Sequence, residues 1–577
     1  MSEPRERTYL GLDFSTQQLK AAVLDDDLNV LHETCVQYDN DLPEFRTYGG
    51  ALHPKDEPGS AAAPTLMWVK ALDMILDRLR VCGVDFGRVA GVSGCAQQHG
   101  TVYWARGARR ALNRLDPDRF LHEQLVAAFS VSPAPIWMDS STGAECRRLE
   151  EVAGGAKVRT RAARPEASLP RVTFFQRLAE ITGSRATERF AGPQIAKLAR
   201  RRPEAYENTE RISLVSSFAA SLFLGDYAPI DWADGSGMNL LDIRAKDWRD
   251  ELLEACAPGL RERLGQPVSS STDLGPLSGY FVERFGFREG CRVVAFTGDN
   301  PCSLAGLRLK EGELACSLGT SDALFLYLSH PRTSTDGSVF CNPVRDDAYM
   351  ALIWYGWVAL ALAPQLHGRS ALCRRISFKN GSLTRERVRD AAAGSDWRLF
   401  DELLDNTPRG NFGNLGLYYD APEILPRGLD GDHRFNRAGD RVARYSSVEV
   451  EVRALVEGQF VARRAHAEDF GFVVGPGCRI VATGGASGNR AMLQVLADVF
   501  DSPVHVSEAA NSAVLGAAYR AKHALLEDGR SFEELLSCLP EPTLVCQPYP
   551  DAESIYKPML QRYRRIVEQL TSGQRSD

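Results

Sequence analysis

Apolar and β-branched residues near the N-terminus fall into short runs that are separated by polar turns. One run covers residues 8–13, a polar turn follows, and a second run covers residues 19–24. A third run, residues 30–37, comes after the aspartate-rich turn 25–27. Runs of this length, bounded by turn residues, are typical of β-strands. The pattern therefore predicts three consecutive strands at the start of the chain.

Longer segments show helical spacing and alternate with further short runs. Apolar residues recur three and four positions apart over Leu66–Leu79, and residues 447–468 and 490–500 are also predicted as helices. Ser446 and Glu449 have the spacing of a capping box at the start of the second helix. Residues 89–94 form another apolar run. Strands that alternate with helices indicate an α/β architecture.

The strand–turn–strand pattern of residues 8–24 occurs again in the second half of the chain. Residues 313–318 and 323–328 are predicted strands, joined by the polar turn 319–322. We interpret this as an internal repeat, with one copy in each half. Two more short strands, residues 293–296 and 479–482, each run into a turn that contains glycine.

Composition narrows the class of protein. A chain of 577 residues corresponds to about two to four domains. The net charge of −7 disfavours a nucleic-acid partner, whose binding normally needs a basic excess. The longest apolar run ends at Pro364, short of the ~20 residues of a spanning helix. The 13 cysteines are scattered and form no C-x-x-C pair. We therefore expect a cytoplasmic protein without a membrane or nucleic-acid partner.

Two stretches interrupt the pattern. Residues 157–171 are strongly basic and without periodicity, and residues 354–375 combine an apolar run with proline, glycine and basic residues. Segments of this kind are expected as surface insertions. We place possible insertions at 157–175 and 354–376; sequence retained from an unspliced gene is the alternative interpretation.

The two hairpins and a Gly-Gly turn carry the candidate chemistry. Successive N–H groups and hydroxyls in a tight turn can bind phosphate without a lysine. Asp13, at the end of the first strand, is a candidate Mg²⁺ ligand because that ion prefers carboxylates and keeps several waters. Gly484 and Gly485 follow a strand and allow a close backbone approach. A tight turn without a ligand remains the alternative at each place. No P-loop motif is present.

A series of motifs in order resembles the FGGY family of carbohydrate kinases over residues 8–565. The motifs are LGLDFSTQQLK (10–20), SGCAQQHG (93–100), WMDSST (137–142), ERFAGPQIAKL (188–198), DGSGMNLL (234–241), FTGDNPCSLAG (296–306), SLGTSD (317–322), VEVRALVEGQF (450–460) and TGGASGN (483–489). The resemblance implies an α/β fold of two actin-like ATPase (ribonuclease H-like) domains flanking a deep cleft. It places an N-terminal, sugar-binding domain at 1–297 and a C-terminal, nucleotide-binding domain at 298–577.

The resemblance also implies the reaction, which is transfer of the γ-phosphoryl group of ATP, with Mg²⁺, to a sugar. The motif order is most similar to the longer eukaryotic branch that phosphorylates D-xylulose. Asp299 stands where the family has its catalytic base, and it contacts the substrate as well. His99, Arg189 and Asn300 match the other sugar-binding positions. Without the resemblance, Asp299 would be read as a helix cap, His99 as a loop residue and Arg189 as a surface ion pair.

The remaining matches lie on the nucleotide side. They are Trp397, Gly484, Gly485, Ala486, Asn489, Thr320 and Ser321. For Trp397, a place in the core is an equal alternative. Asp139 is a motif carboxylate that could also brace the fold, so it is not assigned to catalysis.

Three rival functions stay open at this point. The first is a kinase for another ketose or polyol, because the fold does not select the sugar. The second is a sugar-binding regulator that has lost turnover, and the third is an actin-like or chaperone ATPase. The presence of Asp13, Asp299 and His99 disfavours the last two. A monomer or weak dimer is expected.

Overall fold

The computed structural model divides the chain into two compact units. Unit 1 comprises Met1–Arg308, Ser329–Met350 and Asn511–Pro540, and unit 2 comprises Leu309–Leu328, Ala351–Ala510 and Glu541–Asp577. The structure describes residues 7–54, 56–154, 174–319, 322–355, 380–420, 426, 428–475, 477–507 and 511–573. In the described parts, no helix is both long and apolar enough to cross a membrane.

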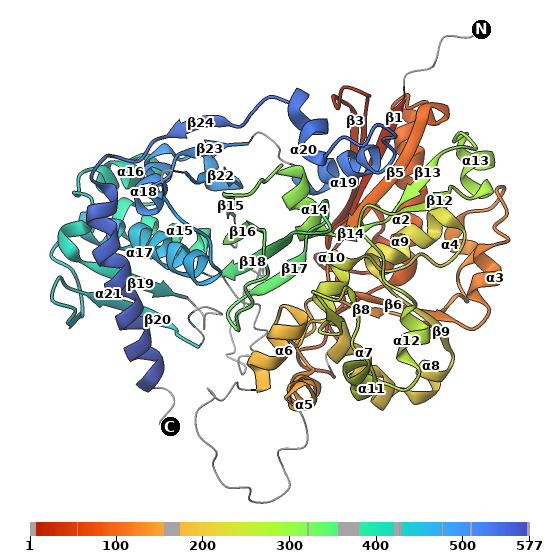
Figure 1. Cartoon of the computed structure of the whole chain (residues 1–577), viewed down its shortest axis with the longest axis horizontal. Coiled ribbons are helices and arrows are strands. Elements are labelled where there is room, and N and C mark those ends of the chain that lie inside the picture. The colour runs from red at the N-terminus through yellow and green to blue at the C-terminus, as the bar shows by residue number, and fades with distance from the viewer. Residues whose placement is uncertain are drawn as a thin grey trace, which may run out of the picture. The chain divides into compact units, whose positions relative to one another are not determined.

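Unit 1 is built on a mixed sheet whose strand order is β12-β13-β5-β1-β2-β3, with β14 also paired to β5 (Figure 1). β1 and β2 form an antiparallel hairpin, and β1 is parallel to β5. The strands are β1 (Thr8–Phe14), β2 (Gln18–Leu24), β3 (Val30–Gln37), β5 (Val89–Ala96), β12 (Asp273–Pro276), β13 (Arg292–Val294) and β14 (Thr297–Gly298).

Helices that bury an apolar face cover this sheet. Helix α2 (Thr65–Val81) buries Trp68, Leu72 and Ile75 in one core with β1, β2 and β5. Helix α19 (Ser512–His523) lies beside β1 (Figure 1). The contact needs a glycine, because a Cβ at Gly11 would lie 2.3 Å from the carbonyl oxygen of Val514. A segment near the end of the chain thus completes the N-terminal sheet.

The rest of unit 1 consists of short helices and small sheets. The other helices are α1 (Tyr38–Asp41), α3 (Ala108–Leu112), α4 (Leu121–Gln124), α5 (Gly143–Ala153), α6 (Phe174–Thr182), α7 (Ala191–Arg201), α8 (Pro203–Glu207), α9 (Val215–Leu224), α10 (Trp232–Gly235), α11 (Asp250–Cys256), α12 (Leu260–Leu264), α13 (Gly279–Phe285), α14 (Asp299–Gly306) and α20 (Phe532–Leu535). The other strands are β4 (Ala62–Ala63), β6 (Thr101–Ala105), β7 (Phe129–Val131), β8 (Ala134–Pro135), β9 (Thr209–Leu214), β10 (Leu241–Asp242), β11 (Asp247–Trp248) and β17 (Ser338–Cys341).

Unit 2 has its own mixed sheet, in which β18, β16, β15, β22, β23 and β24 lie side by side in that order. The strands are β15 (Glu313–Leu318), β16 (Asp322–Leu328), β18 (Tyr349–Tyr355), β22 (Arg479–Thr483), β23 (Val504–Val506) and β24 (Thr543–Cys546), and a small sheet holds β19 (Leu415–Tyr419), β20 (Gly431–Phe435) and β21 (Arg441–Val442). The helices are α15 (Ser382–Ala393), α16 (Trp397–Asp405), α17 (Val448–Asp469), α18 (Arg490–Phe500) and α21 (Ala552–Gly573).

The internal repeat predicted from the sequence is confirmed. In unit 2, β15 and β16 form an antiparallel hairpin, and β15 is parallel to β22. The hairpin of β1 and β2 has the same relation to the parallel strand β5 in unit 1. Each half of the chain therefore starts its sheet in the same way.

One local prediction is wrong, and several lie outside the described residues. Helix α17 is capped by the hydroxyl of Ser447, which accepts from the N–H of Val450, and not by Ser446. The capping side chain therefore comes one residue later than the sequence pattern indicated. Thr320, Ser321 and nearly all of the possible insertions at 157–175 and 354–376 lie outside the described residues. The division of the chain at residue 297 stays a prediction.

Candidate active site

Three neighbouring strand ends of unit 1 bring the predicted sugar-side residues together. Asp13 is the next-to-last residue of β1, His99 follows the end of β5, and Asp299 follows β14 directly. β1 and β14 both run parallel to β5, with Phe14 and Gly298 each opposite Ala96. The ends of parallel strands in an α/β sheet are a common place for a binding site.

Asp299 is the first residue of helix α14, and Gly298 is its cap residue. One of its carboxylate oxygens accepts hydrogen bonds from the backbone N–H and the side-chain amide of Asn300, at 2.8 and 2.9 Å. Burial, followed by the nearby charge of Asp13, raises the pKa of Asp299 to about 7. A carboxyl group with a pKa near neutrality can accept and release a proton at physiological pH.

Gln98 links Asn300, the neighbour of Asp299, to the buried carboxyl group of Asp234. The side-chain oxygen of Gln98 accepts from the amide of Asn300 at 3.0 Å, and its amide donates to Asp234 at 3.3 Å. Asp234 also accepts a hydrogen bond from Ser216 at 2.6 Å. Burial raises the pKa of Asp234 well above its usual range. This chain of bonds fixes the orientation of the Asn300 amide.

Close packing at Gly298 depends on the absence of a side chain. A Cβ at Gly298 would lie 2.5 Å from Cγ of Gln98 and 2.8 Å from Oδ1 of Asp234. Sequence reasoning did not assign Gln98, Asp234 or Gly298 to the site. The signal that could have found them is their place inside the quoted motifs, beside residues that were assigned.

His99 is held as a neutral imidazole. Its Nδ1 lies 2.8 Å from the carbonyl oxygen of Gly237, and its ring stacks on Phe190 with 4.2 Å between ring centroids. Burial, together with the charge of Arg189, lowers the pKa of His99 to about 3. Because a carbonyl only accepts, Nδ1 must carry the proton, which leaves Nε2 able to accept a hydroxyl hydrogen bond. The backbone of His99 is in the left-handed region, with φ of 71°.

Arg189 lies in the loop between α6 and α7, one residue before the ring that stacks on His99. Its guanidinium is near enough to His99 to affect the pKa of the imidazole. Burial lowers the pKa of Arg189 to about 10, so the group stays charged at neutral pH. A half-buried cationic donor next to a neutral acceptor can orient a polyhydroxylated ligand.

The carboxylate of Asp13 is suited to bind Mg²⁺. Burial raises its pKa, and one carboxylate oxygen accepts from the Ser15 hydroxyl at 2.6 Å. Asp13 also lies close enough to raise the pKa of Asp299. Mg²⁺ is usually held by one or two carboxylates together with waters and substrate phosphates, so this donor set suits the ion.

In unit 2, the predicted Gly-Gly turn follows strand β22. Gly484 adopts φ of 88°, and a Cβ there would lie 2.8 Å from the carbonyl oxygen of Leu318. A Cβ at Gly485 or Gly488 would meet nothing within 4 Å. Ala486 lies in the same turn. The backbone is therefore packed tightly at the first glycine and is open at the next ones, as a backbone binding site for a ligand requires.

Asn489 and Trp397 are connected through helix α16. Asn489 caps α18 by accepting from the N–H of Met492 at 2.9 Å, and its amide donates to Asp401 at 2.7 Å. Trp397 lies one helical turn before Asp401, on the same face of α16. The guanidinium of Arg389 lies 4.5 Å from the centroid of the Trp397 ring. One face of the indole is therefore covered by a cation.

Next to the second hairpin, Asp322 makes a buried ion pair with two arginines. Arg385 donates to both of its carboxylate oxygens at 2.7 and 3.1 Å, and Arg463 donates to one of them. The side chains are almost fully buried. The arrangement anchors the first residue of β16 against α15 and α17. Thr320 and Ser321, the predicted phosphate-binding residues of this turn, lie outside the described residues.

Comparisons with known proteins agree with this fold. Two family models match, the N-terminal domain of the FGGY family of carbohydrate kinases over residues 159–306 and its C-terminal domain over residues 314–525. Xylulose kinase from Rattus norvegicus is 50% identical over 570 residues, covering 99% of this chain and 98% of that protein. Xylulose kinase 2 from Arabidopsis thaliana is 44% identical over 537 residues, covering 91% and 88%.

Solved structures show the same fold at low sequence identity. A xyloylose kinase from Brucella ovis has a TM-score of 0.74 at 20% identity, covering 98% of this chain and all of that one. A glycerol kinase from Plasmodium falciparum, with ADP, has a TM-score of 0.69 at 15% identity, covering 98% of each chain. These likenesses support the α/β, ribonuclease H-like fold class predicted from the sequence.

The repeated sheet and the likeness to solved kinase structures define the two-domain α/β fold of sugar kinases. The two domain models and the near full-length relatives specify it further: the chain belongs to the FGGY family of carbohydrate kinases. It is an enzyme of the phosphotransferase class, and ATP is the substrate that this family implies.

Proposed function

We propose that the enzyme transfers the γ-phosphoryl group of ATP to D-xylulose and forms D-xylulose 5-phosphate and ADP. The observation that carries this proposal is the 50% identity, over nearly the whole chain, to a xylulose kinase from rat. Similar support comes from xylulose kinase 2 of Arabidopsis thaliana, which is 44% identical.

The chemistry at the sugar can be assigned to side chains of unit 1. Asp299 accepts the proton of the sugar hydroxyl as its oxygen attacks the γ-phosphorus, and the bond from that phosphorus to the bridging oxygen breaks to release ADP. The pKa of about 7 makes this transfer feasible near neutral pH. His99 accepts a hydroxyl through Nε2, while Arg189 and the amide of Asn300 donate. A neutral sugar needs several such contacts, since it has no charge to anchor it.

The nucleotide is assigned to the glycine turn of unit 2. Gly484, Gly485, Ala486 and Asn489 would hold the adenosine, with Trp397 against it, and Thr320 and Ser321 would bind the phosphates. The open space at Gly485 and Gly488 supports this assignment. Asp13 would hold Mg²⁺, which neutralises charge on the phosphates when bound.

A second candidate is a kinase for a different ketose or polyol. The neighbours that share this fold include proteins described as a gluconate kinase and a glycerol kinase, with TM-scores of 0.72 and 0.69. Proteins with this fold therefore act on acceptors of different chemistry. The acceptor specificity must depend on the residues that bind the sugar, and not on the fold.

A coupled assay of ADP release over a panel of ketoses, aldoses and polyols tests the proposal. We expect D-xylulose to give the highest kcat/KM, and Asp299→Ala to lose at least about 10³-fold in kcat. A higher kcat/KM with another acceptor would favour the second candidate. Sugar binding without ADP release from the intact chain would instead indicate a sugar-binding regulator.

We also propose a cytoplasmic enzyme that is a monomer or weak dimer and has no nucleic-acid or membrane partner. Every cysteine in the described part of the chain is a free thiol, which supports a reducing compartment. The net charge of −7 supports the absence of a nucleic-acid partner.

A further inference from the structure

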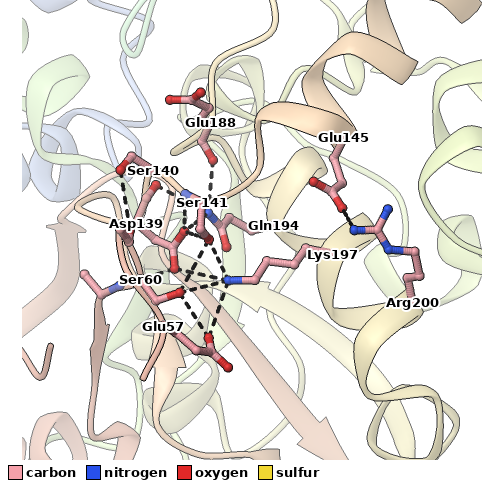
Figure 2. A network of polar contacts seen from close by, with 12 residues as sticks. Glu57, Ser60, Asp139, Ser140, Ser141, Glu145, Glu188, Gln194, Lys197 and Arg200 are labelled. Carbon is pink, nitrogen blue, oxygen red and sulfur yellow. Dashed lines mark hydrogen bonds and ion pairs between the residues drawn. The ribbon is translucent and has the colours of Figure 1, made fainter. Parts of the chain in front are cut away.

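Asp139, the motif carboxylate without an assigned part in catalysis, lies at the centre of a polar network (Figure 2). One of its oxygens accepts from the backbone N–H of Ser141 at 2.9 Å and from the amide of Gln194 at 2.9 Å. The other oxygen accepts from the N–H of Ala61 at 3.2 Å. Burial alone would raise the pKa of Asp139, but the hydrogen bonds from Ser141 and Gln194 outweigh it and hold the pKa below its usual range.

Lys197 joins a third segment to this carboxylate. It extends from helix α7 and donates to the hydroxyls of Ser60 and Ser141, at 3.0 and 2.6 Å (Figure 2). Its Nζ lies 3.6 Å from Asp139 and 3.8 Å from Glu57. We call Asp139, Ser141, Gln194 and Lys197 the Asp139 network. It connects residues 57–61, the loop 137–142 and helix α7 within unit 1.

The network continues to the backbone just before Arg189. The amide of Gln194 donates to the carbonyl oxygen of Glu188 at 3.0 Å, in addition to Asp139. The hydroxyl of Thr142 donates to the same carbonyl oxygen. Gln194 and Thr142 are both almost fully buried. Two buried donors on one carbonyl fix the position of this peptide group more firmly than a loop in solvent would be fixed.

The residues that follow this carbonyl are the ones that contact the predicted sugar site. Arg189 comes next, and Phe190 follows and stacks on the ring of His99. A shift of the Glu188 carbonyl would therefore move both the guanidinium and the stacked ring. Small displacements of substrate-contacting groups have large effects on affinity and rate.

We propose that Gln194, held by Asp139, is a positioning residue that sets Arg189 and His99 for sugar binding. The inference rests on the proposed function, since it deepens the assignment of the same sugar site. It assigns a function to the WMDSST motif, whose carboxylate acts through another side chain and does not touch the sugar.

Gln194→Met is the main test, because it keeps the length of the side chain and removes its amide. We expect the KM for the best acceptor sugar to rise about tenfold, with kcat within about twofold and the KM for ATP unchanged. Thr142→Val removes the second donor to the Glu188 carbonyl, and a smaller rise in the sugar KM is expected. An unchanged sugar KM in both variants would overturn the proposal.

Arg200→Met provides a matched control on the same helix. Arg200 forms an ion pair with Glu145, and this pair lies apart from the network (Figure 2). Its loss should lower thermal stability and leave the sugar KM unchanged. If Arg200→Met raised the sugar KM as much as Gln194→Met, the effect would be general destabilisation, and the proposal would fail.

A measurement without any sugar separates this inference from the proposed function. The ring protons of His99 should resonate upfield because Phe190 stacks on the imidazole, and His99→Gln assigns the signals. We expect Gln194→Met to move these signals downfield and Arg200→Met to leave them in place. If the wild-type protein phosphorylates no sugar, the proposed function is wrong, but the spectra of His99 still test the positioning of the ring. If the His99 signals do not move in Gln194→Met, the positioning inference is wrong.

Discussion

Asp299, the proposed base, can accept a proton only when its carboxyl group is ionised, and its pKa of about 7 places this change near neutral pH. Because burial raises the folded-state pKa, protonation is favoured in the folded enzyme below pH 7. We therefore expect kcat/KM for the sugar to rise about tenfold per pH unit up to pH 7 and to level off above it. Steady-state assays at subsaturating sugar between pH 5 and 9 measure this profile.

The Asp13→Asn variant tests whether the charge of Asp13 contributes to the raised pKa of Asp299. The charge of Asp13 contributes to the raised pKa of Asp299, after burial itself. Removing the charge should lower the overall rate and move the midpoint of the profile to lower pH. A midpoint that stays at 7 in this variant would show that Asp13 does not set the pKa.

Gly298→Ala tests the packing next to Asp299, the proposed catalytic base. The backbone of Gly298 has φ of −71°, which alanine adopts freely, so only the contact with Gln98 and Asp234 opposes the change. We expect displacement of Gln98 and a fall in kcat of about 100-fold. Gly290→Ala is the control, because its Cβ would make only ordinary contacts with Arg288. Equal kinetics of the two variants would contradict the argument.

The site residues that could be predicted from the sequence are those that are proposed to carry the chemistry. Asp13, His99 and Asp299 follow predicted strands, so the sheet brings them together by its topology. Gln98 and Asp234 were not assigned, because only their place inside the motifs pointed to them and their bond joins positions far apart in the chain. Neither the periodicity nor the residue type of Gln98 shows which distant side chain it will meet.

At the scale of elements, the hydrophobic pattern predicted the first strands, helix α2 and the two hairpins, because each is decided by local alternation or helical spacing. It did not show which elements pack together. Helix α19 lies against β1 and α14, and this contact depends on glycines on both sides. Such a fit between distant segments has no local signature.

Gly516→Ala tests the crossing of α14 and α19. A Cβ at Gly516 would lie 2.1 Å from the carbonyl oxygen of Cys302 and 2.8 Å from the backbone N of Gly306. The helices must separate to accept it, and α14 begins with Asp299. We expect a loss of about 2–3 kcal/mol in the free energy of unfolding, measured by urea titration, and reduced kcat. A stability equal to that of Gly290→Ala would refute the tight crossing.

A buried hydrogen-bond network joins helices α17 and α21 in unit 2. The hydroxyl of Tyr556 donates to Glu457 at 2.7 Å, and the same oxygen accepts from Arg453 and from the N–H of Gly410. Tyr556→Phe removes one donor to a buried carboxylate. We expect a loss of about 1–2 kcal/mol, measured by thermal unfolding. Tyr549→Phe, at a half-exposed ring, should leave stability unchanged; an equal loss there would contradict the assignment.

At the scale of the whole molecule, neither compact unit is one continuous stretch of sequence. Asn511–Pro540 joins unit 1, although Ala351–Ala510 before it belongs to unit 2. The single division at residue 297, which the family resemblance implies, stays a prediction. Local patterns in the sequence indicate where elements begin and not to which core they return. Residues Asn511–Pro540 belong to unit 1 because α19 packs closely against β1 at Gly11.

Deletion of the possible insertion at 157–175 tests whether the fold and the sugar site need this segment. Gly154, at the end of α5, and Phe174, at the start of α6, are in contact, since a Cβ at Gly154 would lie 1.8 Å from Cδ1 of Phe174. The two residues that flank 155–173 are therefore close together in space. Replacing residues 155–173 by a short Gly-Ser linker should close this gap at little entropic cost.

We expect this deletion to leave the melting temperature within about 2 °C and the sugar KM within about twofold, because none of the assigned site residues lies in 155–173. Differential scanning fluorimetry and the coupled ADP assay measure both quantities. A variant with residues 155–173 in scrambled order controls for length. Loss of sugar binding in the deletion and the scrambled variant alike would mean that the segment's own sequence contributes to the site. Retention in both means that it is an insertion the fold of α5 and α6 tolerates.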